Sequence, residues 1–215
     1  MTLVDGLGLW CEITGEGYAG RAAIFLDRDG VIVEEVSYLG RAQDLRMLPG
    51  AAQAIARCNR LGIPIVLVSN QSGVGRGYYS WSDFQAVQAA LAAALAAQSA
   101  RVDAVLACAY HPEAGGRYCI ANHDWRKPNP GMILAAAERM KLDLANSWVV
   151  GDRTSDLAAG RAAGLGGGVL VTTGHGMHER TDALALATER YIVEVSATLE
   201  EAVKVPIRFF HPVDC

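Results

Sequence analysis

Short apolar runs alternate along the chain with stretches in which apolar residues recur at helical spacing. The runs are nearly continuous in apolar character, which is typical of strands covered on both faces of a sheet. We predict strands at Ala22–Leu26, Ile63–Ser69, Ala104–Ala109, Trp148–Gly151, Gly168–Thr172 and Tyr191–Val193. This alternation predicts repeated βα units and a mainly parallel sheet.

Segments with apolar residues at helical spacing follow most of these predicted strands. It is clearest between Phe84 and Leu95, where apolar residues fall on one face that we interpret as core packing. Ser80 with Asp83 forms a capping-box sequence just before that face. We predict helices at Pro49–Leu61, Asp83–Gln98, Pro130–Met140, Ser155–Ala163 and Ser196–Val203.

The elements predict an α/β fold, a three-layer Rossmann-like sandwich without an insert long enough to form a cap domain. We expect an irregular extension at 1–21, one domain at 22–205 and a tail at 206–215. The longer irregular stretches, at 31–48, 71–81 and 111–130, follow predicted strands. Because loops after the carboxyl ends of parallel strands build the crevice of such folds, we expect the chemistry there.

The amino-acid composition narrows the classes of function that the protein could have. The 215 residues are 51% hydrophobic and 20% charged, values typical of a globular protein with a substantial core. The net charge of −4 disfavours nucleic acid as a partner but not a phosphorylated metabolite, which local cations can bind. The five cysteines are scattered, the N-terminal segment does not resemble a signal peptide, and Ala86–Ala97 is too short to span a bilayer. We therefore expect a cytoplasmic monomer with free thiols and no contact with a membrane.

Two carboxylates follow the first predicted strand. Asp27 and Asp29 stand two residues apart on extended chain, so their side chains point to the same side. Like charges at this spacing need a cation or a proton, and Mg²⁺ suits an oxygen-rich site beside the turn that Gly30 permits. The same residues could instead form an acidic turn that caps the next segment.

Polar residues also follow the second predicted strand. The segment SNQSGVGRG begins with Ser69, Asn70, Gln71 and Ser72. Their hydroxyl, amide and backbone N–H groups can cradle a phosphoryl oxygen, although the same residue types form ordinary turns.

Two further segments carry charge. Arg126 and Lys127 precede two prolines that favour a helix start, so they form either a solvated basic turn or a site that stabilises a transferring phosphoryl group. Asp152 follows the strand at Trp148–Gly151 and could ligate a metal, or simply cap the next helix. Asp156 could lie behind the metal ligands and hold Lys127 or a water on the metal.

In this order, the segments resemble the haloacid dehalogenase superfamily of phosphohydrolases over about residues 22–175. The match is carried by Asp27, Asp29, Ser69, Lys127, Asp152 and Asp156. Within the superfamily, LDRDG, SNQSGVGRG and RKPNPGM are similar to the heptose-bisphosphate phosphatase and histidinol-phosphatase group, whose cap is small or absent.

The resemblance implies a site for each step of a phosphatase reaction. Asp27 would be the nucleophile and Asp29 the general acid and base, with Mg²⁺ held by Asp27, Asp152 and the backbone carbonyl of Asp29. Ser69 and Lys127 would stabilise the phosphoryl group. The implied substrate contacts are Glu35, Val36, Ser37, Tyr38, Ser69, Asn70, Gln71, Ser72, Arg126 and Lys127.

The expected function is Mg²⁺-dependent hydrolysis of a small phosphorylated metabolite through a phosphoaspartate. A heptose phosphate or bisphosphate is the first expectation for the substrate. A histidinol-phosphate phosphatase and a non-catalytic phosphate-binding module are the alternatives. A phosphomutase would need a larger cap, and a polynucleotide phosphatase would need a basic channel or stacking aromatics.

Relatives in the heptose group carry a structural zinc loop with a Cys-x-His pair and a later Cys-x-Cys pair. Here Cys108 remains, but Tyr110, His123 and Trp125 stand at the other three positions. A different set of soft ligands would be Cys108, His111, Cys119 and His123. Its spacing matches no zinc template, so we expect no structural zinc and a loop closed by packing of Tyr110 and Trp125.

Two histidines, His175 and His178, lie in or beside the Gly-rich stretch Thr173–Met177. We interpret this stretch as a solvated turn, with no part in the chemistry.

Overall fold

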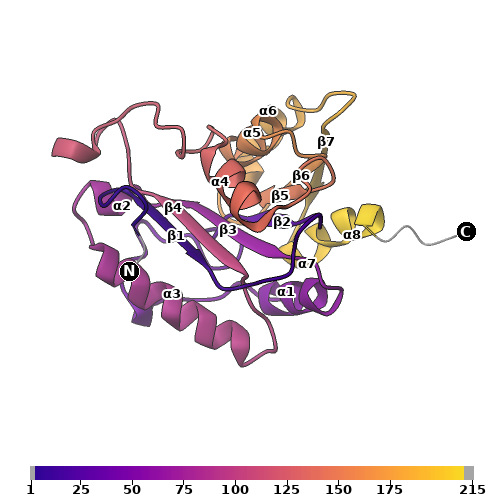
Figure 1. The fold of residues 1–215 in the computed structure, drawn as a ribbon, viewed down its shortest axis with the longest axis horizontal. Coiled ribbons are helices and arrows are strands. Elements are labelled where there is room, and N and C mark those ends of the chain that lie inside the picture. The colour runs from indigo at the N-terminus through magenta and orange to yellow at the C-terminus, as the bar shows by residue number, and fades with distance from the viewer. Residues whose placement is uncertain (1–2, 211–215) are drawn as a thin grey trace, which may run out of the picture.

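Seven strands form one sheet in the computed structural model, which describes residues 3–210 (Figure 1). The strands are β1 (Leu9–Ile13), β2 (Ile24–Leu26), β3 (Ile65–Asn70), β4 (Ala104–Cys108), β5 (Trp148–Gly151), β6 (Gly167–Val171) and β7 (Ile192–Ser196). They lie in the order β1-β4-β3-β2-β5-β6-β7. All neighbouring pairs are parallel except β1 with β4, so the predicted mainly parallel sheet is confirmed.

Helices cover both faces of this sheet. The α-helices are α1 (Ala51–Arg60), α2 (Ser72–Gly75), α3 (Trp81–Ala96), α4 (Gly131–Met140), α5 (Thr154–Ala162), α6 (Gly176–Leu184), α7 (Leu199–Ala202) and α8 (Lys204–Phe210). Two short 3-10 helices are η1 (Ala42–Asp44) and η2 (Gly116–Tyr118). Figure 1 shows α1, α3 and α7 on one side of the sheet and α4, α5 and α6 on the other, which confirms the three-layer α/β sandwich.

The apolar strands supply both layers of the core. In β2, Ile24 and Leu26 pack into the cluster under α1, α3 and α7, whereas Phe25 packs into the cluster under α4 and α5. Successive residues of a strand point to opposite faces, so a strand buried on both faces reads as one continuous apolar run. This is why the central strands could be predicted from the sequence.

Two expectations about local structure are wrong. The lead at 1–21 is not irregular throughout, because β1 pairs with β4 along its full length. The stretch Thr173–Met177 is not only a turn, since α6 begins at Gly176 and includes His178. Of the segment expected as a tail, 206–215, the part through Phe210 belongs to α8, and residues 211–215 lie outside the described part of the chain.

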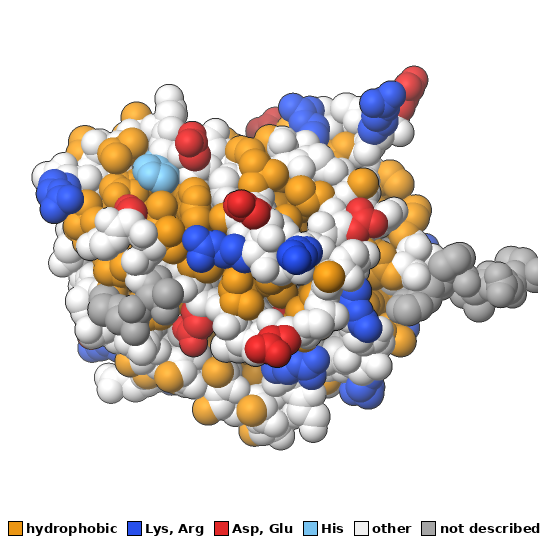
Figure 2. Space-filling model, viewed as in Figure 1, with side chains coloured by type: hydrophobic (Ala, Val, Ile, Leu, Met, Phe, Trp, Pro, Cys, Tyr) orange, Lys and Arg blue, Asp and Glu red, His pale blue; other side chains and the backbone are white. Residues whose placement is uncertain are grey.

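No helix among residues 3–210 combines the length and the hydropathy that a membrane crossing requires. On the face drawn in Figure 2, the described Lys and Arg side chains are interspersed with Asp and Glu and form no continuous basic stripe.

Candidate active site

The polar segments singled out in the sequence meet at the carboxyl edge of the central strands. Asp27 follows β2, Ser69 is the next-to-last residue of β3, and Asp152 follows β5. Since β2 lies between β3 and β5, the chain leaves β2 toward one side of the sheet and later returns on the other. Such a switch point opens a crevice at the strand ends. A cavity of about 490 Å³ lies there.

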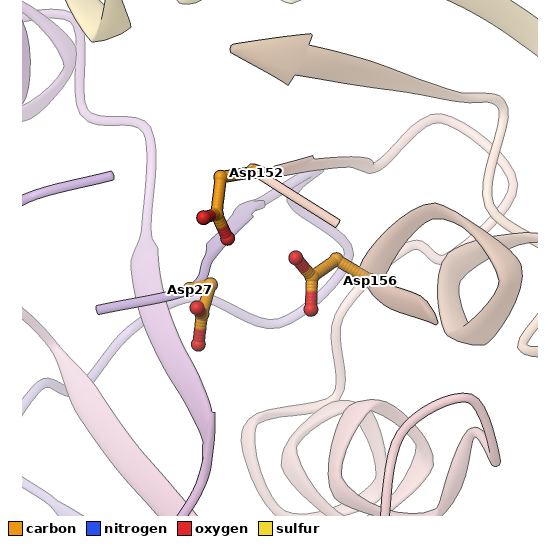
Figure 3. A group of neighbouring side chains, drawn as sticks. All are labelled: Asp27, Asp152 and Asp156. Atoms are coloured by element: carbon orange, nitrogen blue, oxygen red, sulfur yellow. The ribbon is translucent and has the colours of Figure 1, made fainter. Parts of the chain in front are cut away.

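Three carboxylates surround one point in this crevice (Figure 3). One oxygen each from Asp27, Asp152 and Asp156 lies within 4.8 Å of the others. Asp152 is buried, and its Oδ1 has no hydrogen-bond partner. Its Oδ2 accepts a bond from the backbone N–H of His175 at 2.8 Å.

Burial, followed by repulsion from Asp27 and Asp156, raises the pKa of Asp152 to about 8. A buried oxygen without a partner in an acidic cluster is what a bound cation would satisfy. Hard oxygen ligands suit Mg²⁺, so these residues fit the expected metal. The turn beside them requires Gly30, which has a φ of 77° and whose Cα hydrogen faces the Asp152 carboxylate.

Lys127 connects two of these carboxylates. Its Nζ donates to Asp27 Oδ1 at 2.8 Å and to the carbonyl of Val68 at 2.9 Å, and it lies 2.7 Å from Asp156 Oδ1. Burial opposes the ammonium charge, but Asp156 and Asp27 outweigh it and hold the pKa of Lys127 above its usual value. Lys127 is therefore a fixed cation beside Asp27, and Asp156 holds it there.

The side chain of Asp29 has a different environment from that of Asp27. It is paired with Arg28, whose Nη2 lies 2.9 Å from Asp29 Oδ2. Arg28 is buried, and its guanidinium also contacts Gln71 and lies over the ring of Phe84 at 5.6 Å from the centroid. Gln71 Nε2 in turn donates to Ser69 Oγ at 2.7 Å and to Asp29 at 3.3 Å. Arg28, Asp29, Gln71 and Ser69 thus form one hydrogen-bonded group.

The residues expected to contact substrate line the same cavity. They are Glu35, Val36, Ser37, Tyr38, Ser69, Asn70, Gln71, Ser72, Arg126 and Lys127. Tyr38 has a φ of 66°, an unusual conformation for a residue with a side chain, and its ring packs edge-on against Tyr78 at 4.6 Å. Asn70 fixes the backbone of Lys127: its amide nitrogen donates to the Lys127 carbonyl, and its amide oxygen accepts from the Lys127 N–H.

Several lining residues were missed in the sequence. They are Arg28, Arg76, Tyr79, His111, Arg153, Ser155 and His175. Arg76 stands within the segment SNQSGVGRG, so its motif was a usable signal. His175 was wrongly assigned to a solvated turn: its backbone contacts Asp152, and its Nε2 is buried without a hydrogen-bond partner. No local pattern around His175 indicates this, because the contact joins β5 to the segment after β6.

Arg76, His111 and Arg126 also line the cavity. Arg76 Nη2 lies 3.3 Å from the ring nitrogens of His111 and 2.6 Å from Glu113 Oε2. Burial, followed by the charges of Arg126 and Arg76, lowers the pKa of His111. Two arginines and a histidine therefore lie near one another in the cavity lining, and Arg76 is also paired with Glu113.

The loop between β4 and α4 is closed by stacked rings. Tyr110 stacks on His123 with centroids 4.3 Å apart and 12° between planes, and Trp125 packs against the same apolar cluster as Tyr110. Burial raises the pKa of the Cys108 thiol to about 12, whereas Cys119 is exposed. Within residues 3–210, the only group of three or more His, Cys, Asp or Glu side chains close enough to share an ion is the aspartate cluster. The set Cys108, His111, Cys119 and His123 does not converge, so it does not fit zinc.

Comparisons with known proteins agree on one family. The HAD-hydrolase-like family profile matches residues 124–201. The D-glycero-beta-D-manno-heptose-1,7-bisphosphate 7-phosphatase of Mesorhizobium japonicum is 45% identical over 170 residues, which cover 76% of this chain and 76% of that protein. The D-glycero-alpha-D-manno-heptose-1,7-bisphosphate 7-phosphatase of Burkholderia mallei is 43% identical over 150 residues, 69% of this chain and 79% of that one.

Two solved structures share the whole fold. A HAD-like phosphatase from Mesorhizobium loti superposes with a TM-score of 0.84 at 35% identity, covering 97% of this chain and 95% of that one. The D,D-heptose 1,7-bisphosphate phosphatase of B. bronchiseptica, complexed with magnesium and phosphate, superposes with a TM-score of 0.75 at 33% identity, covering 87% and 98%. Sequence identity, fold and site geometry agree: the chain belongs to the haloacid dehalogenase-like hydrolases and is a phosphatase of that family.

Proposed function

We propose that this phosphatase removes one phosphate from a sugar bisphosphate, with D-glycero-D-manno-heptose 1,7-bisphosphate as the substrate. The observation that carries the proposal is that the cavity is lined by two sets of basic side chains with different partners. Lys127 pairs with Asp27, whereas Arg76 and Arg126 lie near His111. A substrate with two phosphates would use both groups, and the relatives named above act on such a compound.

At the reacting end, Asp27 attacks the phosphorus atom. A bond forms between the Asp27 carboxylate oxygen and phosphorus while the bond from phosphorus to the sugar oxygen breaks. Lys127 and Ser69 stabilise the charge on the transferring group, and Asp156 keeps Lys127 in position. When bound by Asp27, Asp152 and the backbone carbonyl of Asp29, Mg²⁺ supplies further positive charge at the phosphoryl oxygens.

Asp29 handles the protons. It gives a proton to the leaving sugar oxygen, then accepts one from the water that hydrolyses the phosphoaspartate. Its contacts with Arg28 and Gln71 fix the carboxyl group two residues from Asp27, within the same cavity.

At the other end, Arg126 and Arg76 bind the phosphate that is retained. Guanidinium groups suit this task because they offer several N–H donors in fixed geometry to phosphate oxygens. The segment 35–38 and the polar turn 69–72 also line the cavity and would contact the sugar.

We also propose that the protein works as a monomer in the cytoplasm. The four cysteines in the described residues are unpaired thiols, which suits a reducing compartment.

The proposal is tested by phosphate release from a panel of substrates, with Mg²⁺ and with EDTA. The panel contains heptose 1,7-bisphosphate, heptose and other sugar monophosphates, histidinol phosphate and nucleotides. We expect Mg²⁺-dependent turnover that is highest for the bisphosphate. Asp27→Asn removes the nucleophile and should lower turnover of every substrate by roughly four orders of magnitude or more.

The second phosphate site has its own variant. Arg126→Ala should lower kcat/KM for the bisphosphate by about 10- to 100-fold, the loss expected for a hydrogen bond to a charged group, and change monophosphate turnover little. Arg41→Ala is the control, since Arg41 is 72% exposed, pairs with Asp44 and lies outside the cavity. Preference for histidinol phosphate, or equal loss on mono- and bisphosphates in Arg126→Ala, would overturn the assignment.

A further inference from the structure

The segment that leads into β1 is bonded to the base of the loop that carries Arg126. Asp5 Oδ1 accepts bonds from the backbone N–H groups of Leu7, Gly8 and Leu9 at 3.0, 2.9 and 3.0 Å. The other carboxylate oxygen, Oδ2, accepts a bond from the hydroxyl of Tyr110. One aspartate therefore shapes the N-terminal turn and ties it to the residue that follows β4 and Ala109.

The same turn is fitted to the ring of Tyr110. A Cβ atom on Gly8 would lie 2.6 Å from Tyr110 Cζ, so the ring occupies the space that any larger residue would need. The carbonyl of Gly8 accepts a bond from Ala109 at 2.9 Å. The carbonyl of Leu7 accepts a bond from Trp81 Nε1 at 2.8 Å, which anchors the turn to α3.

Tyr110 in turn contacts His123 and Arg126, which lie near the end of the loop between β4 and α4. Its ring stacks on His123, and its carbonyl accepts a bond from Arg126 Nη1 at 3.1 Å. The backbone N–H of Arg126 donates to the carbonyl of His123 at 2.8 Å. Both the backbone and the guanidinium of Arg126 are thus held through Tyr110 and its stacking partner.

We propose that Asp5, Gly8 and Tyr110 are positioning residues that set the place of Arg126 in the pocket. The N-terminal turn acts as a clamp: Asp5 and Gly8 fix Tyr110, and Tyr110 fixes Arg126 through the His123 stack and its own carbonyl. None of the three lines the cavity, so their effect on substrate passes through Arg126. The inference rests on the proposed function for its effect on catalysis, because Arg126 is there the residue that binds the retained phosphate.

Tyr110→Phe tests the clamp with the least change, because it removes the hydroxyl and keeps the stacked ring. We expect KM for the sugar bisphosphate to rise about threefold to tenfold, the effect of one lost hydrogen bond, with kcat nearly unchanged. An aryl monophosphate such as p-nitrophenyl phosphate should keep its wild-type constants, since it has no second phosphate for Arg126. Gly8→Ala should raise the same KM by pushing on the ring.

Gly115→Ala is the matched control in the loop itself, because a Cβ atom there would meet no atom within 4 Å. Hydrogen exchange supplies a second readout, which needs no substrate. In Tyr110→Phe the amides of residues 111–126 should exchange faster than in the wild type, and in Gly115→Ala at the wild-type rate.

The outcomes separate this inference from the proposed function. Wild-type KM in Tyr110→Phe, or an equal loss with the aryl phosphate, would overturn the clamp even if exchange changes. If the wild type does not hydrolyse the heptose bisphosphate, the proposed substrate fails and exchange alone decides the clamp: faster exchange supports it, and wild-type exchange overturns it.

Discussion

Asp152 holds an uncompensated negative charge whenever it is ionised without a cation. It is buried, it faces Asp27 and Asp156, and one of its oxygens has no hydrogen-bond partner. The folded protein therefore binds a proton on Asp152 far more tightly than the unfolded chain does. Proton and Mg²⁺ compete for the same oxygen atoms.

This competition predicts a pH-dependent stability. The pKa of Asp152 is about 8 in the folded protein against 3.8 ordinarily, so its stabilising contribution is complete below pH 3.8 and is lost as the pH rises toward 8. In EDTA, we expect the melting temperature to fall between about pH 4 and pH 8 and to level off above pH 8, and saturating Mg²⁺ to remove most of that fall.

Asp152→Asn is the control for this measurement, because the amide stays neutral at every pH. Its melting temperature in EDTA should vary little over the same range and should not respond to Mg²⁺. An equal pH slope in the variant and the wild type would show that other groups cause the effect.

Single residues were predictable where their motif lies at the end of a strand. Asp27 and Asp152 were expected in one crevice, and the structure brings them there. Arg28 was passed over because its neighbours Gln71 and Phe84 are remote in sequence, and burial of an arginine depends on such partners. Asp5 was missed for the same reason: its partner Tyr110 lies 105 residues away.

At the scale of elements, β1 is bound to the fold by aromatic packing. Trp10 is 1% exposed and lies 5.7 Å from Trp81 and 5.5 Å from Phe84 between ring centroids. Both partners belong to α3, so one strand fastens the edge of the sheet to its longest helix. The N-terminal extension is therefore part of the core.

Trp10→Ala should lower the free energy of unfolding by about 3–5 kcal/mol, as for other large aromatic residues truncated in a core. Ile13→Ala, on the same strand but 37% exposed, should cost about 1 kcal/mol or less. Urea unfolding followed by far-UV circular dichroism measures both. Similar values for the two variants would mean that β1 is only loosely attached.

The elements that escaped prediction share a short length or a polar pattern. In β1, only Leu9, Trp10 and Cys11 are buried, too few to stand out from the polar lead. Helix α6 buries only two of its nine residues, Gly176 and Ala183, so it shows no apolar face. By contrast, β5 was predicted with its observed bounds because all four of its residues are buried.

At the scale of the whole molecule, the net charge of the chain and the local charge in part of the cavity have opposite signs. The chain has a net charge of −4, yet Arg76, His111 and Arg126 lie near one another in the lining of the cavity. A bisphosphate is repelled at long range and attracted only within the pocket. Arg76 and Arg126 are partly exposed, so dissolved salt screens their attraction for the second phosphate.

Ionic strength should therefore separate the two kinds of substrate. Raising salt from about 50 to 300 mM should increase KM for the bisphosphate several-fold and KM for a sugar monophosphate less, because screening acts on each ion pair that forms. Steady-state kinetics at constant free Mg²⁺ measures the difference. The same increase for both substrates would contradict binding of the second phosphate by the arginines.

The class of the fold was predictable, but its strand order was not. Alternating apolar runs and helical patterns indicate an α/β sandwich whatever the pairing of the strands. The order β1-β4-β3-β2-β5-β6-β7 depends on contacts between strands that are remote in sequence, and so does the antiparallel pairing of β1 with β4. Local spacing contains no information on such pairing.

That pairing also bears on how the chain is made. β1 leaves the ribosome before every other strand, yet its partner β4 begins only at Ala104, and Trp81 and Phe84 in α3 also follow much later. During synthesis the apolar side chains of the Leu9–Ile13 segment stay exposed to solvent. The segment can pair with β4 only after about half of the chain has emerged from the ribosome. Pairing over so long a separation is slow to form. The first of these seven strands to be made therefore stays unpaired until the fourth has emerged.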